Sequence, residues 1–474
     1  MERTTAAEKA LVAPFFELAE REPERVWAAA ACGTRTLAAS RARIERAAHG
    51  LRKRGFLRGT IAGLVVGAQP ASIEALAALW CAELVPLLID PAVPRGAEAE
   101  IARRMGARIA WRPSESWNDE LELERVRNVS DAAPRLLPAA AAVKLTSGSS
   151  GEPRGIQVSA AALRADTDAL VACLGLCASD RSLVAVPLSH SYGFSVLAVP
   201  ALTHGIALVF PGAEGVLSAA RDLRATFLPS VPAWFRSVLR SEQLTELAPS
   251  LRLLVSAGAP LAPDVAREFR ARFGLAIHVL YGASECGSIT YDRTGGAAER
   301  GSVGTPLDGV SIELEERAAN QDPGLVCVRS PAAAIGYVPE LEGDGECLSR
   351  GRYRSADLAR WKSGELELCG RRSDWINVKG RKVDPREVEA AIAAHPDVRE
   401  VAVLAKPRPG REHARDDELV RAVIVRDGDL GFLDVIDWCR TRLAPHQLPR
   451  SVVFVGELPR TERGKLDREK LIAL

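Results

Sequence analysis

An alternation of short apolar runs with helix-like segments, from residue 61 to about residue 290, limits the possible folds most strongly. The uninterrupted apolar runs at 61–66 and 84–89 are typical of strands that are buried on both faces. Between such runs, segments such as 71–83 and 160–174 carry apolar residues at helical spacing. Strands separated by helices predict a largely parallel α/β sheet. The region is long enough for one large domain made of two similar α/β halves.

The same alternation of apolar runs and helix-like segments predicts the remaining elements of the large domain. Residues 7–55 are expected to form helices around a short hairpin at 26–37. Ser159 is expected to cap the helix at 160–174. Further strands are predicted at 108–110, 182–186, 206–210, 225–227, 251–256 and 277–280, and further helices at 97–105, 196–201, 216–224, 233–239 and 264–273.

After residue 291 the pattern changes to short β segments with glycine turns, which predicts a smaller β subdomain ending near Cys369. From Gly370 onward the chain predicts a separate α+β unit. Asp384, Pro385 and Glu387 stand at the N-cap, first-turn and N3 positions of a helix, so we predict a helix beginning at Pro385. The predicted domain organisation is 1–370, a short polar connection at 371–374, and a small mobile domain at 375–474.

The charge balance argues against a polyanionic partner. The 474 residues include 62 Lys and Arg against 61 Asp and Glu, which gives no net field to attract nucleic acid or anionic lipid.

Nine cysteines form no C-x-x-C pair, and reduced thiols in the cytoplasm are expected. The most apolar stretch, 73–89, is interrupted by Glu74, Glu83 and Pro86, so we expect neither a membrane span nor an export signal.

A glycine- and hydroxyl-rich segment at 146–155 reads Thr-Ser-Gly-Ser-Ser-Gly-Glu-Pro-Arg-Gly. Glycines let backbone N–H groups converge and hydroxyls add donors, so this segment is a candidate phosphate cradle in which Arg154 supplies charge. It is not a Walker sequence, because it lacks the Gly-Lys-Ser/Thr ending and is followed by β-like residues. The alternative is a flexible surface loop, which such a composition also favours.

Further stretches carry polar residues close to predicted strand ends and turns. They are Pro-Leu-Ser-His-Ser-Tyr-Gly-Phe-Ser at 187–195, Ser-Ala-Gly-Ala-Pro-Leu at 256–261, Tyr-Gly-Ala-Ser-Glu at 281–285, Tyr-Arg-Ser-Ala-Asp-Leu at 353–358, the run at 370–389, and Pro-Arg-Thr-Glu-Arg-Gly-Lys-Leu-Asp-Arg at 459–468. Alone, each has a structural alternative: a hydrogen-bonded core histidine, a solvated glutamate or lysine, or an aspartate in a turn. In order and spacing, these stretches and the loop resemble the adenylate-forming superfamily of acyl-CoA synthetases, peptide-synthetase adenylation domains and luciferases.

The resemblance runs from about residue 10 to the end of the chain and implies an ATP site. By this resemblance the catalytic residues are Lys465, Glu285 and His190, and Glu285 holds Mg²⁺, which prefers hard oxygen ligands. The residues implied for ATP binding are Thr146, Ser147, Gly148, Ser149, Ser150, Gly151, Arg154, Gly258, Ala259, Tyr281, Gly282, Ser284, Asp357, Arg371 and Lys465. The family pattern has threonine and lysine where Ser150 and Arg154 stand, and glycine where Ala356 stands.

The resemblance also implies an acyl pocket. Members that activate amino acids tend to carry an aspartate in the segment at 187–195 that pairs with the substrate ammonium, and this segment has none, so an α-amino acid is disfavoured. The implied pocket residues are His190, Tyr192, Phe194, Ser195, Trp234, Ala257, Gly258, Tyr281 and Ala283. This largely apolar set suits a fatty or an aromatic acid, and a fatty acid is expected because no residue suggests a partner for a ring hydroxyl.

The implied reaction has two steps: a carboxylic acid is activated to acyl-AMP with release of pyrophosphate, and the acyl group then passes to a thiol. Ser373 would be the hinge between the steps, and Lys379 and Gly380 would line the thiol tunnel, while Asn377 replaces a common lysine. Coenzyme A is the expected acceptor, which makes the chain an acid–thiol ligase. The alternatives are an adenylation enzyme that loads the phosphopantetheine of an acyl carrier protein, and a nucleotide-binding protein without catalysis.

Overall fold

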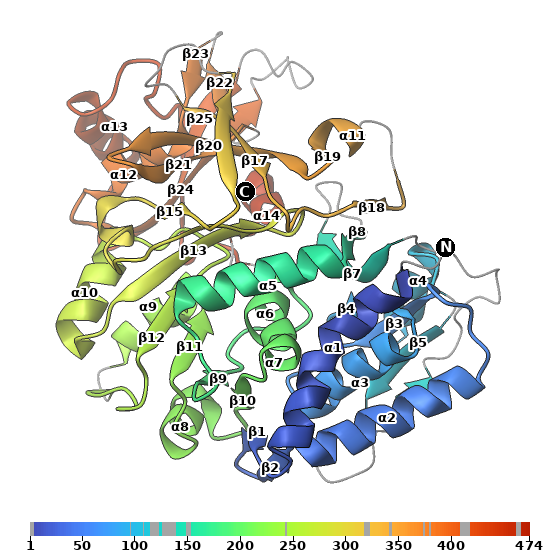
Figure 1. Cartoon of the computed structure of the whole chain (residues 1–474). Coiled ribbons are helices and arrows are strands. Elements are labelled where there is room, and N and C mark those ends of the chain that lie inside the picture. The colour runs from blue at the N-terminus through green and yellow to red at the C-terminus, as the bar shows by residue number, and fades with distance from the viewer. Residues whose placement is uncertain are drawn as a thin grey trace. The chain divides into compact units, whose positions relative to one another are not determined.

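The computed structural model of the chain is shown in Figure 1. It describes residues 4–94, 96–107, 109–113, 123–125, 139–147, 153–241, 244–316, 323–340, 344–372, 375–378, 381–407, 418–460 and 466–474. No helix within these ranges is long and apolar enough to cross a membrane.

A seven-stranded sheet forms the first half of the large region, in the order β18-β8-β7-β4-β3-β5-β6. Its inner strands are parallel to one another, as predicted from their continuous apolar runs. They are β3 (Ile61–Val65), β4 (Val85–Ile89), β5 (Ile109–Pro113) and β7 (Ala140–Ser147). The antiparallel strands are β6 (Leu123–Arg125), β8 (Pro153–Ser159) and β18 (Gly336–Val338).

A nine-stranded sheet forms the second half, in the order β15-β14-β13-β12-β11-β9-β10-β1-β2. The six strands from β13 to β1 are parallel, and the others are antiparallel. The strands are β1 (Val26–Ala30), β2 (Gly33–Thr36), β9 (Arg181–Leu183), β10 (Ala207–Val209), β11 (Phe227–Ser230), β12 (Leu253–Ser256), β13 (Ile277–Ala283), β14 (Gly287–Tyr291) and β15 (Thr305–Pro306). Two sheets of this kind confirm the predicted α/β fold with two halves.

Helices separate the strands and supply about half of the residues of the largest core cluster (Figure 1). The helix α1 (Thr4–Arg21) packs on α3 (Pro70–Cys81), α5 (Ala160–Leu174) and α7 (Val199–Thr203), and every residue of α3 is buried. The Ser159 hydroxyl accepts a hydrogen bond from the N–H of Ala162 at 3.1 Å, which confirms the predicted cap of α5. The other helices are α2 (Leu37–Lys53), α4 (Ala97–Arg104), α6 (Ser191–Gly193), α8 (Gly215–Asp222), α9 (Pro232–Arg240) and α10 (Pro263–Phe273), with a π-helical segment at Phe194–Ala198.

Most predicted elements differ from the structure by a few residues at their ends, and the helix predicted at 196–201 is a π-helical segment at Phe194–Ala198 followed by α7. Two strands show the cause of such a difference. The strand predicted at 225–227 lies at Phe227–Ser230, because Ala225 still donates its N–H to the Ala220 carbonyl and thereby ends α8. The strand predicted at 182–186 ends at Leu183, since the N–H of Ala185 turns back to the Leu183 carbonyl.

A five-stranded sheet follows, in which β16-β17-β20-β19 are neighbours and β21 pairs with β20. Its strands are β16 (Ser311–Glu315), β17 (Gly324–Arg329), β19 (Leu348–Ser349), β20 (Arg352–Lys362) and β21 (Glu365–Arg371), and the short helix α11 (Asp344–Cys347) precedes β19. This is the predicted β subdomain.

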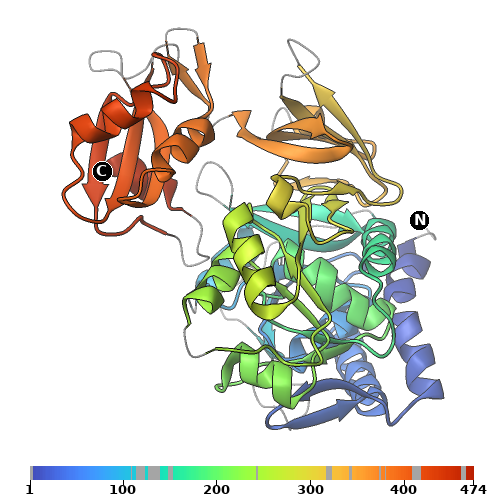
Figure 2. The same cartoon turned by 90° about the vertical axis from the view of Figure 1, so that its left-hand side faces the viewer.

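The C-terminal part, orange to red in Figure 2, has its own core. The helices α12 (Pro385–Ala393) and α13 (Phe432–Arg440) pack on one face of the sheet β24-β25-β26, and α14 (Arg468–Ala473) packs on the other. The sheet strands are β24 (Val398–Pro407), β25 (Glu418–Arg426) and β26 (Ser451–Val455), and a hairpin of β22 (Ile376–Val378) and β23 (Arg381–Val383) precedes them. The Asp384 carboxylate accepts from the N–H of Arg386 at 2.9 Å, which confirms the predicted start of α12.

The chain divides into two compact units. The first comprises 1–313, 327–355 and 362–366, and the second comprises 314–326, 356–361 and 367–474. A large N-terminal region and a small C-terminal domain are therefore present, whereas the connection at 371–374 stays a prediction.

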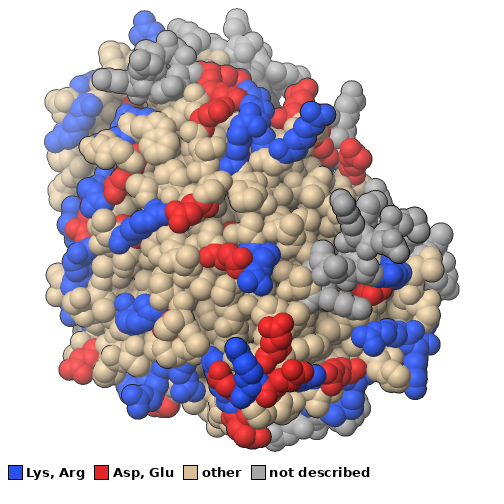
Figure 3. Space-filling model, in the orientation of Figure 1, with Lys and Arg blue, Asp and Glu red and all other residues tan. Residues whose placement is uncertain are grey.

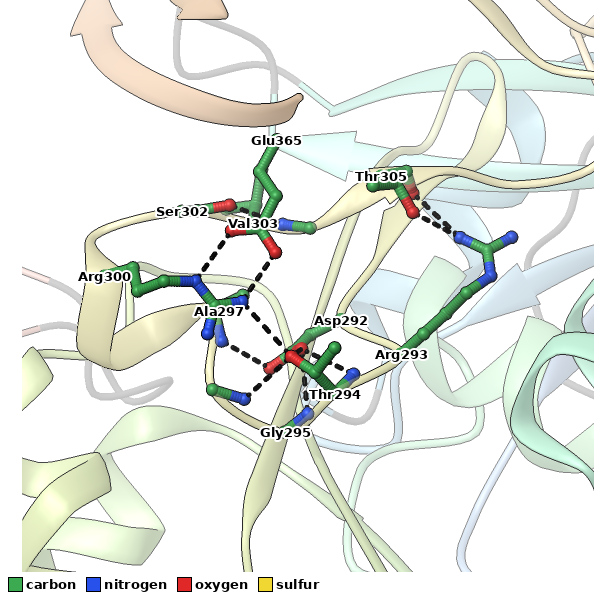
Figure 4. Close-up of polar contacts among 12 residues, drawn as sticks. Asp292, Arg293, Thr294, Gly295, Ala297, Arg300, Ser302, Val303, Thr305 and Glu365 are labelled. Atoms are coloured by element: carbon green, nitrogen blue, oxygen red, sulfur yellow. Dashed lines mark hydrogen bonds and ion pairs between the residues drawn. The ribbon is translucent and has the colours of Figure 1, made fainter. Parts of the chain in front are cut away.

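The turn after β14 is built around one buried carboxylate. Asp292 is 1% exposed and accepts hydrogen bonds from the N–H groups of Thr294, Gly295 and Ala297 at 3.0, 2.9 and 2.9 Å. The Thr294 hydroxyl donates to the same carboxylate at 2.9 Å (Figure 4). Arg300 donates to the Thr294 oxygen and to Glu365, which joins the turn to β21.

We expect Asp292→Ala to lower the free energy of unfolding by about 3 kcal/mol or more, because several buried donors would lose their acceptor. Urea denaturation measures the loss. The control is Asp308→Ala, since Asp308 is 93% exposed and lies near the same segment; it should change stability by less than about 0.5 kcal/mol. Equal effects of the two substitutions would contradict the role assigned to Asp292.

Candidate active site

The carboxyl ends of the parallel strands in both sheets carry most of the predicted site residues, and ligands of open α/β sheets bind at such ends. Asp90 directly follows β4 of the first sheet, and His190 follows β9 of the second. His190 Nε2 lies 2.7 Å from Asp90 Oδ2, so this pair links the carboxyl ends of strands in the two sheets. Ser189 also donates to Asp90, at 3.3 Å.

The glycine- and hydroxyl-rich segment lies between β7 and β8, which pair as an antiparallel hairpin. Thr146 is opposite Arg154 in the register, and its hydroxyl lies 3.5 Å from the Arg154 carbonyl oxygen. Ser147 is opposite Pro153 at the end of the hairpin. A strand rather than a helix follows the segment, as predicted. The predicted phosphate-binding residues Gly148, Ser149, Ser150 and Gly151 lie outside the described residues.

Tyr337 connects Arg154 with Glu285. The Arg154 guanidinium lies 4.4 Å from the centre of the Tyr337 ring, and the Tyr337 hydroxyl lies 3.5 Å from Glu285 Oε1. Arg154 also forms an ion pair with Asp344 at 2.6 Å. Its buried Nε has no hydrogen-bond partner within the described part of the chain. Sequence reasoning missed Tyr337, because it belongs to a strand far along the chain.

Glu285 follows β13 and is half-buried. Its carbonyl oxygen accepts from the N–H of Ala334 at 2.8 Å, which fixes the backbone of this turn. The neighbouring Ser284 hydroxyl lies 2.7 Å from that of Ser191, so the two segments that carry His190 and Glu285 are in contact. The described residues contain no group of three or more potential metal ligands. A single carboxylate still fits Mg²⁺, which usually takes its other ligands from phosphates and water.

The predicted acyl-pocket residues after His190 differ in their surroundings. Tyr192 donates to the Val255 carbonyl at 3.0 Å, and burial raises its pKa well above the ordinary value. Phe194 is fully buried, with its ring 6.5 Å from that of Trp80. Ser195 donates to Asp166 at 2.7 Å. The structure thus places Phe194 in the core, and its contact with a substrate stays a prediction.

The remaining predicted residues of the large region follow neighbouring strands. Ala257, Gly258 and Ala259 come after β12, and Gly258 has a φ of +82°, which favours glycine. Trp234 lies on α9 with its ring 5.2 Å from that of Phe235. Tyr281, Gly282 and Ala283 end β13, where a Cβ on Gly282 would stand 2.6 Å from the Gly287 carbonyl oxygen.

Sequence comparison identifies the family. The profile of the family described as AMP-binding enzyme matches residues 15–338. The chain belongs to this family of AMP-binding enzymes. The profile of the AMP-binding enzyme C-terminal domain matches residues 387–465.

Several relatives of this AMP-binding enzyme are similar over most of its length. A feruloyl-CoA synthase of Amycolatopsis sp is 30% identical over 466 residues, 90% of each chain. A 2-succinylbenzoate–CoA ligase of Bacillus licheniformis is 28% identical over 365 residues, 74% of each chain. The crystal structure of ATP-bound MatB from Rhodopseudomonas palustris has a TM-score of 0.85 at 25% identity and covers 98% of each chain. The predicted superfamily and the prediction of an acid–thiol ligase are confirmed.

Two residues of the AMP-binding enzyme that are predicted to bind the nucleotide, Asp357 and Arg371, belong to the second unit. Arg371 Nε donates to Asp357 Oδ1 at 2.9 Å, between the paired strands β21 and β20. Asp357 is half-buried and Arg371 is exposed. Their predicted contacts with ribose stay predictions. Asn377 lies on β22, where its N–H donates to Glu418 at 2.8 Å.

Four further predicted residues of the AMP-binding enzyme lie outside the described residues: the hinge residue Ser373, the tunnel residues Lys379 and Gly380, and the catalytic Lys465. Figure 3 shows basic and acidic side chains interspersed on one face of the molecule, in line with the balanced charge of the sequence.

Proposed function

We propose that the protein activates an aromatic carboxylic acid with ATP and transfers the acyl group to coenzyme A. The observation that carries this proposal is the Asp90–His190 pair, which joins the two sheet edges beside the segment of Glu285. An imidazole held by a carboxylate and facing a nucleotide site is suited to orient a substrate carboxylate.

In the first step, an oxygen of the substrate carboxylate attacks the α-phosphorus of ATP, and pyrophosphate leaves. Lys465 would bridge the carboxylate and the α-phosphate, where negative charge develops. The hydroxyls of the segment at 146–155 and the guanidinium of Arg154 would hold the β- and γ-phosphates. Mg²⁺ held by Glu285 would neutralise charge on the leaving pyrophosphate.

In the second step, the sulfur of the thiol attacks the acyl carbonyl carbon, and AMP leaves. Rotation of the C-terminal domain about Ser373 would withdraw Lys465 and bring Lys379 and Gly380 to the site. Coenzyme A is the proposed acceptor because the relatives are named as CoA ligases. A carrier protein is the competing acceptor, and the second experiment below distinguishes the two.

The class of acid is proposed from the names of the relatives. Feruloyl-CoA synthase, 2-succinylbenzoate–CoA ligase and indoleacetate–CoA ligase are named for acids with aromatic rings. The expectation of a fatty acid rested on the lack of a partner for a ring hydroxyl, whereas none of these three relatives is named for a fatty acid. An aromatic acid is therefore favoured over a fatty acid.

ATP–pyrophosphate exchange with a panel of ferulate, benzoate, indoleacetate, octanoate and hexadecanoate tests the first step. We expect exchange with at least one aromatic acid at a kcat/KM at least tenfold above both fatty acids. A higher kcat/KM of exchange for a fatty acid than for every aromatic acid would contradict the proposed class. If none of the acids supports exchange but ATP binding is measurable, the protein is a non-catalytic nucleotide-binding protein.

A second experiment supplies the accepted acid and ATP with either coenzyme A or a phosphopantetheine-loaded carrier protein. The thioester formed is measured by mass. Turnover with coenzyme A supports the proposal, whereas thioester formation on the carrier protein alone overturns it.

The Asp90–His190 pair gives a separate prediction. Asp90→Ala should lower kcat of exchange by about tenfold with little change in the KM for ATP, because the imidazole loses the partner that orients it. Asp90→Asn keeps an acceptor for the ring N–H and should lose less. The control is Asp168→Ala, because Asp168 pairs with His204 at 3.2 Å and neither is a predicted site residue. Loss of activity in the control alone would argue against the role of Asp90.

A further inference from the structure

The guanidinium of Arg154 is held by groups from a distant part of the chain. Its Nη2 lies 2.6 Å from Oδ2 of Asp344 and 3.5 Å from the carbonyl oxygen of Pro339. Its central carbon lies 4.4 Å from the centre of the Tyr337 ring. The Arg154 and Asp344 side chains are 22% and 15% exposed, so water screens this ion pair only in part. An edge and a face of the guanidinium therefore both have partners.

The position of the Tyr337 ring follows from the register of the first sheet. β18 pairs with β8 in antiparallel orientation, and Val338 lies opposite Gly155 (Figure 1). Tyr337 and Arg154, the residues before these two, are therefore diagonal neighbours on one face of the sheet. Gln157 Nε2 also donates to the Tyr337 carbonyl at 2.8 Å. The backbone that carries the ring is thus fixed to β8, the strand on which Arg154 lies.

The hydroxyl end of Tyr337 reaches the predicted Mg²⁺ ligand. Its oxygen lies 3.5 Å from Oε1 of Glu285. Burial raises the pKa of the Tyr337 hydroxyl above its ordinary value, so the hydroxyl keeps its proton and can donate a hydrogen bond to the carboxylate. The N–H of Ala334 donates to the Glu285 carbonyl oxygen at 2.8 Å. The segment 334–337 therefore contacts both the backbone and the side chain of Glu285.

An arginine suits the surroundings of position 154 better than a lysine. A planar guanidinium can lie over an aromatic ring and donate along its edge to a carboxylate at the same time. The ammonium of a lysine is a compact charge without a flat face. The family pattern has lysine where Arg154 stands, so Tyr337 and Asp344 form surroundings that match the residue of this chain.

We propose that Tyr337 is a positioning residue for MgATP. Its ring orients the Arg154 guanidinium toward the β- and γ-phosphates, and its hydroxyl orients the Glu285 carboxylate toward Mg²⁺. One side chain thereby aligns the cation and the metal ligand that act on the same triphosphate. This inference rests on the proposed function, because Arg154 and Glu285 have these roles only in that reaction.

A double-mutant cycle tests the contact with the ring. The variants are Arg154→Lys, Tyr337→Leu and their combination in the full-length protein, and circular dichroism checks their folding. Each single substitution should raise the KM for MgATP in pyrophosphate exchange and the Kd for MgATP in calorimetry about fivefold or more, with a smaller change in kcat. The combined variant should bind MgATP little worse than the weaker-binding single variant, because a lysine uses the ring much less than an arginine does.

Tyr337→Phe tests the contact with Glu285. It keeps the ring beside Arg154 and removes the hydroxyl. The Mg²⁺ concentration needed for half-maximal exchange should rise about threefold or more, because the carboxylate loses the donor that orients it. At saturating Mg²⁺, the KM for ATP should rise less than in Tyr337→Leu.

The matched control is another contact between an arginine and a ring. The Arg426 guanidinium on β25 lies 4.3 Å from the centre of the Phe454 ring on β26, and neither is a predicted site residue. Phe454→Leu removes a ring from a similar contact. It should leave the Kd for MgATP and the Mg²⁺ requirement unchanged.

The outcomes separate this inference from the proposed function. A folded Tyr337→Leu variant whose Kd for MgATP stays within twofold of the wild type would show that Tyr337 only anchors β18, and would overturn the inference. Independent effects of Arg154→Lys and Tyr337→Leu would overturn it as well. If Tyr337→Leu does not fold, Tyr337→Phe decides, since an unchanged Mg²⁺ requirement overturns the inference. A wild type that catalyses no exchange would instead overturn the proposed function, and the inference with it.

Discussion

Lys465→Ala is expected to slow acyl-AMP formation by about a hundredfold or more, the usual cost of losing one positioned charge at a displacement of this kind. The ammonium would neutralise charge that develops between the substrate carboxylate and the α-phosphate. Transfer from supplied acyl-AMP to coenzyme A should be nearly unchanged, because Lys465 would leave the site before that step. Pyrophosphate exchange measures the first step, and thioester formation from synthetic acyl-AMP measures the second.

Lys470 provides the control for this substitution. It lies on α14 five residues further along, is 70% exposed, and pairs with Asp467 at 3.3 Å. Lys470→Ala should leave both steps unchanged, whereas Lys465→Arg keeps the charge and should recover part of the first step. Full-speed adenylation by Lys465→Ala would show that the proposed chemistry is wrong.

Glu285→Gln should lower kcat/KM for MgATP by about a hundredfold, because the amide keeps the shape and the Tyr337 contact but loses the charge that attracts Mg²⁺. The Mg²⁺ concentration needed for half-maximal exchange should rise. Titrating Mg²⁺ at fixed ATP separates this effect from weaker binding of the acid.

Glu365→Gln is the matched control for Glu285. Glu365 is also partly buried, but its carboxylate pairs with Arg300 at 2.6 Å in the structural network of Figure 4. Its replacement should leave the Mg²⁺ dependence unaltered. An unchanged Mg²⁺ requirement in Glu285→Gln would exclude Glu285 as the ligand.

Much of the fold could be predicted from local patterns. The apolar runs at 61–66 and 84–89 became β3 and β4, and the caps at Ser159 and Asp384 mark the starts of α5 and α12. The strand expected to end at 227 continues through Pro229 to Ser230. Because proline is unusual inside a central strand, the local pattern predicted the end of this strand too early, before Pro229.

The sequence by itself determined the α/β class, the small C-terminal domain and the ordered motifs, because helical and strand periodicities, caps and glycine-rich turns are local properties. Only the tertiary structure decided which distant side chains meet. Asp90 reaches His190, and Tyr337 lies between Arg154 and Glu285. Asp166 on α5 accepts hydrogen bonds from Ser195 and Ser288. These partners are brought together by the order of strands in two sheets and by packing of α5, and no spacing along the chain encodes either.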